Sequence, residues 1–393
     1  MDFDLWSPAL RDDPYPYYDR LRAEAPVHRS HLGPWLLARH SDGEGVLRGF
    51  RRFANIDPVA WHGAEAAPRP LHAVMRRFFL FRHPPDHTRL RTLVAKAFTP
   101  RAVEHLRGRI EEIVEERLDA AGRAGGMDVV ADFVFPVPVR VICEMLGVSA
   151  DERDRLRAWT QPLAAVLDSF PDPERLDAAE SAVAEFSGWL RDRIRDRREN
   201  PIDCILSGLI AAEEVGDRLT EDEIVATSIL LIAAGHETTT HLITNAVFAV
   251  LRHPEAAATL REAPALATSA VEETLRWESP VKIVPRVALE DVEIGGHRIA
   301  SGEIVAVLVG ATNRDPERFA NPHRFDIHRG DDGHLSFGHG IRFCIGAPLA
   351  RLEAAIALNA LVRREPGARL AGERLEWLPG LTFRSLRSLR VAF

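Results

Sequence analysis

The sequence predicts a mainly α-helical protein with a minor β region. Helical patterns of apolar residues recur through the first 280 residues, and one of them extends from Thr220 to Leu251 without a proline. After Pro280 the pattern changes to short apolar runs separated by turn residues, which is typical of strands and hairpins. No internal repeat or low-complexity linker is found, so residues 1–393 are predicted to form a single domain.

The first hundred residues mix short helices, short strands and a long irregular segment. Pro14–Glu24 predicts a short helix, Val27–His40 two short strands, and Leu47–Phe53 another short helix. Asn55–Phe81 is rich in Pro, Gly and Ala; such long irregular loops often bind ligands, although a loosely packed surface loop is the alternative. The next helices are predicted at His87–Ala97, Ala102–Ala121, Asp151–Phe170 and Pro173–Arg198, with a buried apolar stretch at Val129–Leu146.

The longest helix is predicted to begin at Thr220. Glu223 follows three residues later, which completes the pattern of a capping box. A helix of about 30 residues is ~45 Å long, so it is expected to cross the middle of the domain. Beyond it we expect helices at Pro254–Arg261, Leu266–Arg276 and Leu349–Arg363, strands at Val284–Leu289, Val292–Ile294 and Ile304–Val309, and a strand-rich tail at Trp377–Val391.

The composition is that of an ordinary globular protein, with 46% apolar and 27% charged residues. The formal net charge of −8 argues against a nucleic-acid partner, because phosphate binding requires a basic surface. Three cysteines are too few and too scattered for a disulfide framework. The start of the sequence carries neither a basic segment nor a long apolar stretch, so we expect a cytoplasmic protein with no membrane partner.

One cysteine lies in a loop whose sequence favours a reactive thiolate. Cys344 is in the glycine-rich segment Phe337–Gly346, directly before a helical pattern that starts at Ala347. Free amides and the positive end of the helix dipole favour a thiolate at such a position. A thiolate presented in this way is a metal ligand or a nucleophile, and the nearby His339 keeps the second alternative open.

A second motif lies inside the long helix. Helical spacing places Ala234, Gly235 and Thr238 on one face, next to the acid Glu237. Glycine in mid-helix costs about 1 kcal/mol relative to alanine, so its presence requires a reason. The small residues leave room either for a broad, flat ligand or for close packing of another helix.

Together these motifs resemble those of the cytochrome P450 superfamily. The loop pattern Phe337-x-x-Gly340-x-x-x-Cys344-x-Gly346 is similar to its haem-binding loop, and the helix motif to its acid–alcohol pair. The resemblance implies the cytochrome P450 fold, with the long central helix over haem b and iron ligated by the thiolate of Cys344. It also implies that Phe337, Gly346, Ala234 and Gly235 contact the haem, and that Glu237 and Thr238 deliver protons to bound oxygen.

The resemblance further assigns charged residues around the haem. Glu273 and Arg276 would form a structural triad with Arg324 that holds the cysteine loop. The haem propionates would be bound by His87, Arg91, Arg286 and Arg342, although many bacterial relatives carry histidine at the position of Arg342.

The activity implied is that of a monooxygenase of secondary metabolism that inserts one atom of O2 into an apolar small molecule. A monomer is expected, with electrons from a ferredoxin and its reductase; the ferredoxin would dock on a basic surface of Arg89, Lys96, Arg101 and Arg342. A peroxide-driven peroxygenase is an alternative, and a non-catalytic haem sensor a remote one; Glu237 and Thr238 favour the monooxygenase. A terpenoid, polyketide, fatty-acyl or aromatic substrate would suit the apolar pocket, whose expected walls are Trp61, Leu230, Ala233, Ile283, Val284, Thr382 and Phe383.

Overall fold

The computed structural model describes residues 7–62, 69–149, 152–168, 173–214, 219–372 and 375–393. The mainly α-helical fold class with small sheets is confirmed. The chain divides into two compact units, the first made of residues 1–54, 107–137 and 238–393, and the second of residues 55–106 and 138–237. That the chain is one functional domain remains a prediction. No helix in the described ranges is long and apolar enough to cross a membrane.

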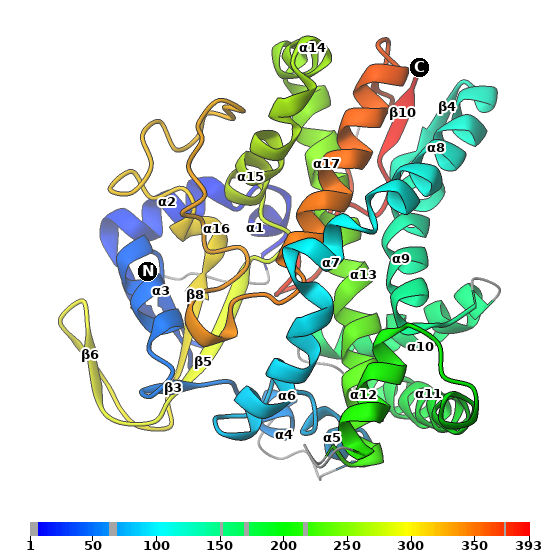
Figure 1. The fold of residues 1–393 in the computed structure, drawn as a ribbon. Coiled ribbons are helices and arrows are strands. Elements are labelled where there is room, and N and C mark those ends of the chain that lie inside the picture. Colours follow the sequence, from blue (N-terminus) through cyan, green and yellow to red (C-terminus); the bar gives the residue numbers. More distant parts are fainter. Residues whose placement is uncertain (1–6, 63–68, 150–151, 169–172, 215–218, 373–374) are drawn as a thin grey trace. The chain divides into compact units, whose positions relative to one another are not determined.

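The first unit contains a five-stranded sheet in the order β1-β2-β8-β5-β3, of which β8, β5 and β3 are labelled in Figure 1. β2 and β8 are parallel, and the other neighbours are antiparallel. In the central pair, Ile283 of β5 lies opposite Leu308 of β8, and Val284 lies opposite Val307. The strands are β1 (Val27–Arg29), β2 (Trp35–Leu37), β3 (Phe53–Ala54), β5 (Ile283–Ala288) and β8 (Ile304–Leu308).

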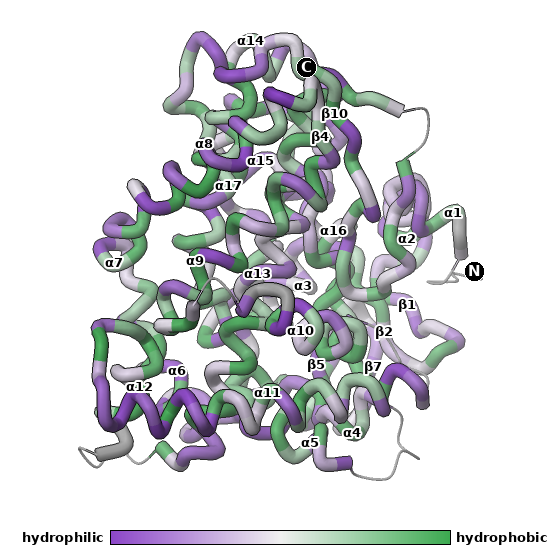
Figure 2. Tube along the Cα trace, turned by 90° about the vertical axis from the view of Figure 1, so that its right-hand side faces the viewer, coloured by the Kyte–Doolittle hydropathy of each residue, from purple (hydrophilic) through white to green (hydrophobic). Residues whose placement is uncertain are grey.

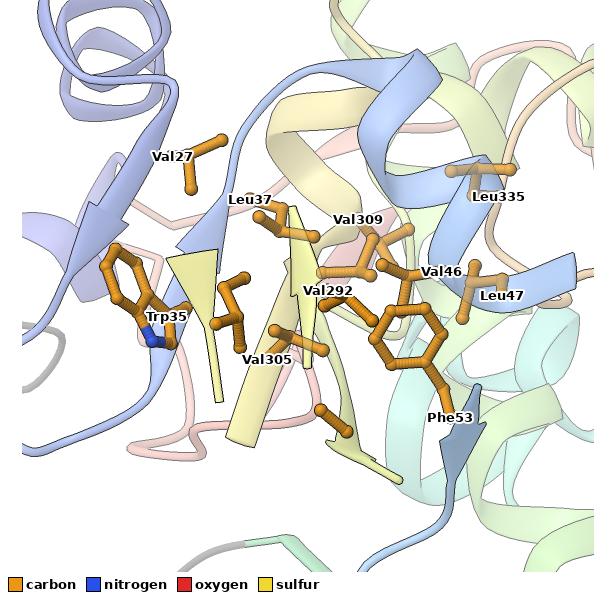
Figure 3. Packing of buried hydrophobic residues seen from close by; sticks show 13 residues of the cluster. Val27, Trp35, Leu37, Val46, Leu47, Phe53, Val292, Val305, Val309 and Leu335 are labelled. Carbon is orange, nitrogen blue, oxygen red and sulfur yellow. The ribbon is translucent and has the colours of Figure 1, made fainter. Parts of the chain in front are cut away.

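Alternation along these strands gives the sheet two apolar faces. On one face, Val305 and Val307 pack with Val46 and Leu47 of α3 (His40–Arg48) and with Leu335, which lies shortly before the cysteine loop (Figure 3). All five of these side chains are at least 98% buried. This cluster therefore anchors the start of the cysteine loop to the sheet.

The remaining elements of the first unit surround helix α17 (Ala347–Arg364), which packs against α8, α14 and α15. A three-stranded sheet has the order β4-β10-β9, and β6 and β7 form a hairpin. The helices are α1 (Pro8–Asp12), α2 (Tyr15–Glu24), α8 (Arg107–Ala124), the π-helix η2 (Val129–Val134), α14 (Pro254–Glu262), η4 (Pro264–Leu266), α15 (Ala267–Trp277), α16 (Val309–Thr312) and η5 (Gly340–Arg342); the strands are β4 (Gly126–Asp128), β6 (Val292–Ile294), β7 (His297–Ile299), β9 (Arg369–Leu370) and β10 (Arg390–Ala392).

The second unit is built from helices. Its largest, α11 (Pro173–Glu199), is amphipathic, and hydrophobic and hydrophilic residues alternate along it at short intervals (Figure 2). Its buried face stacks Phe186 on Trp159 of α10, with ring centroids 5.0 Å apart. The other helices are α4 (Pro58–Trp61), α5 (Pro70–Met75), α6 (Asp86–Ala95), η1 (Lys96–Phe98), α7 (Pro100–Glu104), α9 (Pro136–Leu146, whose first two residues belong to the first unit), α10 (Arg153–Asp168) and α12 (Ile205–Glu214).

The long helix is α13 (Glu221–Arg252), with 32 residues. The predicted capping box is confirmed: the Thr220 N–H donates to Glu223 Oε2 (3.0 Å), and the Glu223 N–H donates to Thr220 Oγ1 (3.2 Å). The helix belongs to the second unit up to Glu237 and to the first unit from Thr238.

The prediction of a helix at Leu47–Phe53 is wrong. Helix α3 ends at Arg48, and Phe53 lies in strand β3. The Gly49 N–H bonds to the carbonyls of Gly45 and Val46 and so closes the helix. Val46 and Leu47 thus belong to the last turn of a helix, not to the first turn of one.

Other differences concern boundaries. The helix predicted from Ala102 is two helices, since Thr99 caps the short α7 and a turn precedes α8. The segment predicted as irregular, Asn55–Phe81, contains α4 and α5, while its residues 63–68 lie outside the described residues. The predicted ends of the helix Asp151–Phe170 likewise fall outside them. Helix α12 and strand β7 were not predicted.

One side chain of α17 gives a testable stability effect. Glu353 is 1% exposed, and its Oε2 has no hydrogen-bond partner among the described residues. Burial raises the pKa of this carboxyl well above its usual value, so the folded protein keeps this proton to a higher pH than the unfolded chain does. The free energy of unfolding therefore decreases as pH rises above about 4.5. Glu353→Gln mimics the neutral form and is expected to increase that free energy by at least ~1.4 kcal/mol at pH 7.5, with no gain at pH 4.

Urea unfolding at the two pH values measures this effect. The control is Glu255→Gln, which removes an exposed carboxylate on α14 and is expected to change little at either pH. A Glu353→Gln protein no more stable than the wild type at pH 7.5 would contradict the assignment of a neutral buried carboxyl.

Candidate functional site

The cysteine loop is closed by its own backbone. The Cys344 N–H donates to the Phe337 carbonyl (2.8 Å), and the Phe343 N–H donates to the Gly340 carbonyl (3.1 Å). Gly340 has φ +67°, and a Cβ there would lie 3.2 Å from Arg48 Cα and 3.3 Å from the Leu47 carbonyl oxygen. Glycine therefore allows both the turn and the close approach of α3. Cys344 is exposed and lies two residues before the N-cap of α17, Gly346.

The segment entering this loop is fixed to the end of α15. The Leu335 N–H donates to Asn313 Oδ1 (2.8 Å), and Ser336 Oγ donates to the Leu275 carbonyl (2.6 Å). Asn313 Nδ2 also donates to Ser336 Oγ (2.8 Å). All of these groups are buried, so each bond satisfies a polar atom that has no access to water. The loop is thus held rigidly from behind.

Two of the predicted propionate ligands lie together in the first unit. Arg286 on β5 is 7% exposed; its Nη1 donates to the Pro285 carbonyl (2.8 Å), and it forms no ion pair with any described residue. Burial and the like charge of Arg342 lower the pKa of Arg286 to about 9. A buried cation beside another cation is an electrostatic arrangement that favours an anionic ligand. His87 and Arg91 lie one turn apart on α6 of the second unit, with His87 buried.

The acid of the long helix has a strongly perturbed environment. Glu237 Oε2 is buried and has no hydrogen-bond partner among the described residues. Burial and the nearby Asp168 raise the pKa of Glu237 to about 7, although Arg157 opposes this shift. The carboxyl is therefore close to half-protonated at neutral pH, which suits a group that accepts and donates protons. Thr238, the predicted alcohol, follows it directly.

The small residues of the motif lie in different surroundings. A Cβ on Gly235 would lie 3.3 Å from Ile142 Cγ1 of α9, so packing against that helix accounts for the glycine. Ala234 is exposed, although Ala233 is buried. His236 is buried: its Nδ1 bonds to the Ile232 carbonyl (2.7 Å), and burial lowers its pKa. His236 thus serves packing.

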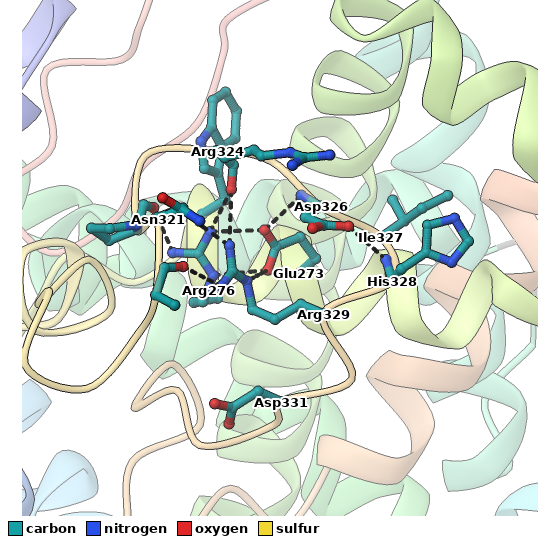
Figure 4. Close-up of polar contacts among 12 residues, drawn as sticks. Glu273, Arg276, Asn321, Arg324, Asp326, Ile327, His328, Arg329 and Asp331 are labelled. Atoms are coloured by element: carbon teal, nitrogen blue, oxygen red, sulfur yellow. Dashed lines mark hydrogen bonds and ion pairs between the residues drawn. The ribbon is translucent and has the colours of Figure 1, made fainter.

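A buried ion-pair network ties α15 to residues 313–329, a meander without helix or strand that precedes the cysteine loop (Figure 4). Arg276 is 0% exposed and binds Glu273 through Nε and Nη2, each at 2.8 Å. Its remaining donors bind the carbonyls of Asn313, Pro322 and Arg324. Since every guanidinium hydrogen has an acceptor, the predicted Glu273–Arg276 pair is confirmed as a buried structural pair.

The prediction that Arg324 supplies the third charge is wrong. Its side chain is exposed and points away from Glu273 in Figure 4, and only its backbone carbonyl joins the network. Arg329 supplies the charge instead, with Nε 2.9 Å from Glu273 Oε2. Arg329 also donates to the carbonyls of Ala320, Asn321 and Arg324, and so gathers the meander around Glu273.

Replacing Arg329 by alanine is expected to lower the free energy of unfolding by roughly 1.5–3 kcal/mol, because Glu273, 1% exposed, loses a charged hydrogen bond but keeps Arg276. Arg324→Ala is the matched control and is expected to stay within ~0.5 kcal/mol of the wild type. Urea unfolding of both variants measures the difference. Equal losses in the two variants would contradict the assignment.

The predicted pocket residues lie in several different parts of the structure. Ile283 packs in a core cluster with Leu308, whereas Val284 lies on the opposite face of β5. The Lys282 N–H donates to the Thr382 carbonyl (2.7 Å), and Phe383 pairs with Val281 through a β-bridge. Phe383 also contacts the ring of His241 on α13, 5.9 Å away. In the second unit Leu230 and Ala233 are each 4% exposed, and Trp61 is half-buried.

The predicted basic docking surface loses one member. Arg89 forms an ion pair with Glu223, the acid of the capping box, at 2.5 Å. Its charge is thereby committed to the start of α13. Lys96 and Arg101 are exposed, and Arg342 is half-buried in the other unit.

Two sets of charged residues were missed in the sequence. Arg329 is one; Glu272, His334 and Arg351 form the other. The pattern Glu-x-x-Arg drew attention to Glu273, while its neighbour Glu272 carried no local signal. Arg329, His334 and Arg351 each lie more than 50 residues from the acid that they bind, so spacing along the chain could not identify them.

Comparison with known proteins places the chain in a family. Residues 68–364 match the family model "Cytochrome P450". The chain is 42% identical to cytochrome P450 monooxygenase PikC of Streptomyces venezuelae, covering 96% of this chain and 91% of that protein. It is 41% identical to vitamin D(3) 25-hydroxylase of Pseudonocardia autotrophica, over 94% and 90%. The crystal structure of P450BioI in complex with an acyl carrier protein ligated to hexadec-9Z-enoic acid superposes with a TM-score of 0.93 at 40% identity, over 98% and 100%.

The chain therefore belongs to the cytochrome P450 family, and it is an enzyme of the oxidoreductase class. The family implies a haem with a cysteine thiolate. The residues present fit such a group, because the first unit offers an exposed cysteine in a rigid loop and a buried arginine, Arg286, without a carboxylate partner among the described residues. Thiolate and paired cations are the donors that iron and propionates require.

Proposed function

We propose that the chain is a haem-thiolate monooxygenase that acts as a single functional domain. It would insert one oxygen atom of O2 into an apolar small molecule. Cys344 would ligate iron, with Phe337 and Gly346 beside it. Arg286 and Arg342, together with His87 and Arg91, would bind the propionates. Bound haem supplies the activation of dioxygen, and the protein's residues hold it, exclude water and move protons.

The observation that carries this proposal is the state of Glu237. A carboxyl of pKa about 7, with a buried oxygen that lacks a partner among the described residues, can both take up and release a proton near neutral pH, and Thr238 of the same motif follows it directly. Glu237 and Thr238 would therefore deliver protons, which the reduction of dioxygen at a bound haem would consume. Glu237 would pass a proton to Thr238 and recover it from solvent. A peroxygenase uses peroxide that is already reduced and protonated, so it does not need this relay.

The substrate is proposed to be apolar. Val284, Thr382 and Phe383 would line one part of its pocket, and Trp61, Leu230 and Ala233 another; Ile283 would act through packing. Support comes from the relatives, whose names include a vitamin D(3) hydroxylase and a complex with an acyl carrier protein ligated to a hexadecenoic acid. Terpenoid, polyketide, fatty-acyl and aromatic compounds of secondary metabolism are therefore the candidates.

The electron donor is proposed to be an acidic ferredoxin served by a reductase. Lys96, Arg101 and Arg342 would attract it, while Arg89 would act through Glu223. We further propose that the protein is cytoplasmic and monomeric.

Electron supply distinguishes the two candidate activities. Compounds of these classes are first screened for binding by the shift that they cause in the haem spin state. Purified haem-loaded protein is then incubated with each binding compound under two conditions. One contains NADPH, ferredoxin and reductase, and the other contains peroxide alone. Product that depends on NADPH and O2 is the expected result. Product formed only with peroxide would favour the peroxygenase, and haem binding without any turnover would favour a sensor.

A further inference from the structure

Helix α15 presents two adjacent carboxylates, and the triad uses only Glu273. Glu272 is bound by Arg351 of α17 in a fork, with Nε to Oε1 at 2.6 Å and Nη2 to Oε2 at 2.9 Å. His334 Nε2 lies 3.1 Å from the same Oε2. The side chains of Glu272, His334 and Arg351 are 14%, 1% and 26% exposed. A bidentate pair this well enclosed fixes the orientation of the guanidinium.

The same guanidinium faces the cysteine loop. Its central carbon lies 4.7 Å from the ring centroid of Phe337, the residue whose carbonyl accepts the Cys344 N–H. The Phe337 ring also contacts the rings of His334 (6.0 Å) and Phe343 (6.1 Å). Arg351 lies in the second turn of the helix that begins directly behind the loop. It therefore joins Glu272 to the aromatic ring at the base of the loop.

Both members of this pair carry full charges. Burial alone would raise the pKa of Glu272, but the bonds from Arg351 and His334 outweigh it and hold the pKa at about 2. Arg351 is likewise kept charged by Glu272, and the thiolate of Cys344 attracts it further. One positive and one negative charge are thus fixed behind the cysteine, and the positive one lies against the loop.

We propose that Arg351 is a positioning residue for Cys344 whose charge raises the reduction potential of the iron bound there, and that Glu272 limits this increase. The inference rests on the proposed function, in that Cys344 must ligate iron. One-electron reduction adds a negative charge to the site. A nearby cation favours the reduced state and a nearby anion disfavours it. Removing the two charges must therefore shift the potential in opposite directions, an effect that a purely structural role of the pair would not produce.

The experiment is a spectroelectrochemical titration of the haem-loaded, substrate-free protein and four variants. Arg351→Gln is expected to lower the equilibrium constant for reduction about tenfold, which corresponds to about 59 mV for one electron. Glu272→Gln keeps a carbonyl acceptor for Arg351 and is expected to raise that constant by a comparable factor. Arg351→Lys keeps the charge and is expected to shift it by much less. Arg364→Gln is the matched control: it removes an ion-paired arginine at the other end of α17, and no shift is expected.

Equal potentials in all variants, or shifts of the same sign in Arg351→Gln and Glu272→Gln, would overturn the inference. If Arg351→Gln does not fold, Glu272→Gln and Arg351→Lys still test the inference. Only a charge effect raises the reduction potential in Glu272→Gln and leaves it nearly unchanged in Arg351→Lys. The ferrous carbonyl spectrum of the wild type is recorded alongside. A wild-type spectrum without the long-wavelength thiolate band would refute the proposed function itself, whereas a normal band with unshifted potentials would refute only this inference.

Discussion

Replacing Cys344 by alanine is expected to abolish product formation. The thiolate is the only protein ligand proposed for iron, and its loop offers no second sulfur among residues 337–346. The electron density that thiolate donates to iron favours cleavage of the oxygen–oxygen bond, and neither water nor a nearby nitrogen donates as strongly. We expect NADPH-supported turnover to fall to background. The measurement is product yield per mole of protein with ferredoxin and reductase.

Cys204→Ala is the matched control. Cys204 is half-buried and contacts Ser207 Oγ (3.4 Å) in the second unit, far along the chain from the loop. Its removal changes one sulfur and no proposed ligand, so turnover should remain at the wild-type level. Turnover retained in Cys344→Ala, or lost equally in both variants, would contradict the ligand assignment.

Replacing Glu237 by glutamine is expected to slow product formation by about 10²-fold, because general acid–base groups contribute 10²–10⁴-fold to a rate, and thereby to lower the yield of product per NADPH. Reducing equivalents should appear as peroxide or water instead, as also expected for Thr238→Ala. In the wild type the yield should fall as pH rises through about 7, since the protonated carboxyl is the donor and its pKa is about 7. The variant should lack this inflection. The measurement is the ratio of product to NADPH between pH 6 and 8.5.

The neighbours of Glu237 give a sharper test of the same idea. Asp168 raises the pKa of Glu237 and Arg157 lowers it, so Asp168→Asn should move the inflection to lower pH and Arg157→Gln to higher pH. Haem content serves as the control for folding in each variant. An inflection that stays in place in both variants, or persists in Glu237→Gln, would show that another group titrates.

The sequence was sufficient for the features that depend on local chemistry. The capping box at Thr220 and Glu223 is an i, i+3 pattern, and both bonds are present. The Glu273–Arg276 pair follows from the same helical spacing. The cysteine loop could be recognised from its glycines. Gly338 and Gly340 adopt positive φ, and this conformation restricts the residue type at those positions.

Features that depend on tertiary packing could not be read in this way. Arg324 and Arg329 are five residues apart in a meander without regular structure, and only the fold decides that Arg329 reaches Glu273. The sequence left two explanations for Gly235, a flat ligand or close packing of another helix, and the position of Ile142 of α9 favours the packing of a helix. Arg89 was expected to remain on a docking surface, but the acid of the capping box binds it. In each case the deciding partner is distant in the sequence.

The most direct test of the account is the carbon monoxide difference spectrum of the reduced, haem-loaded wild-type protein. Ligation of iron by Cys344 predicts the long-wavelength band characteristic of a thiolate, present in Cys204→Ala and absent in Cys344→Ala. A band at the shorter wavelength typical of nitrogen ligation in intact wild-type protein, or a thiolate band that survives in Cys344→Ala, would contradict it.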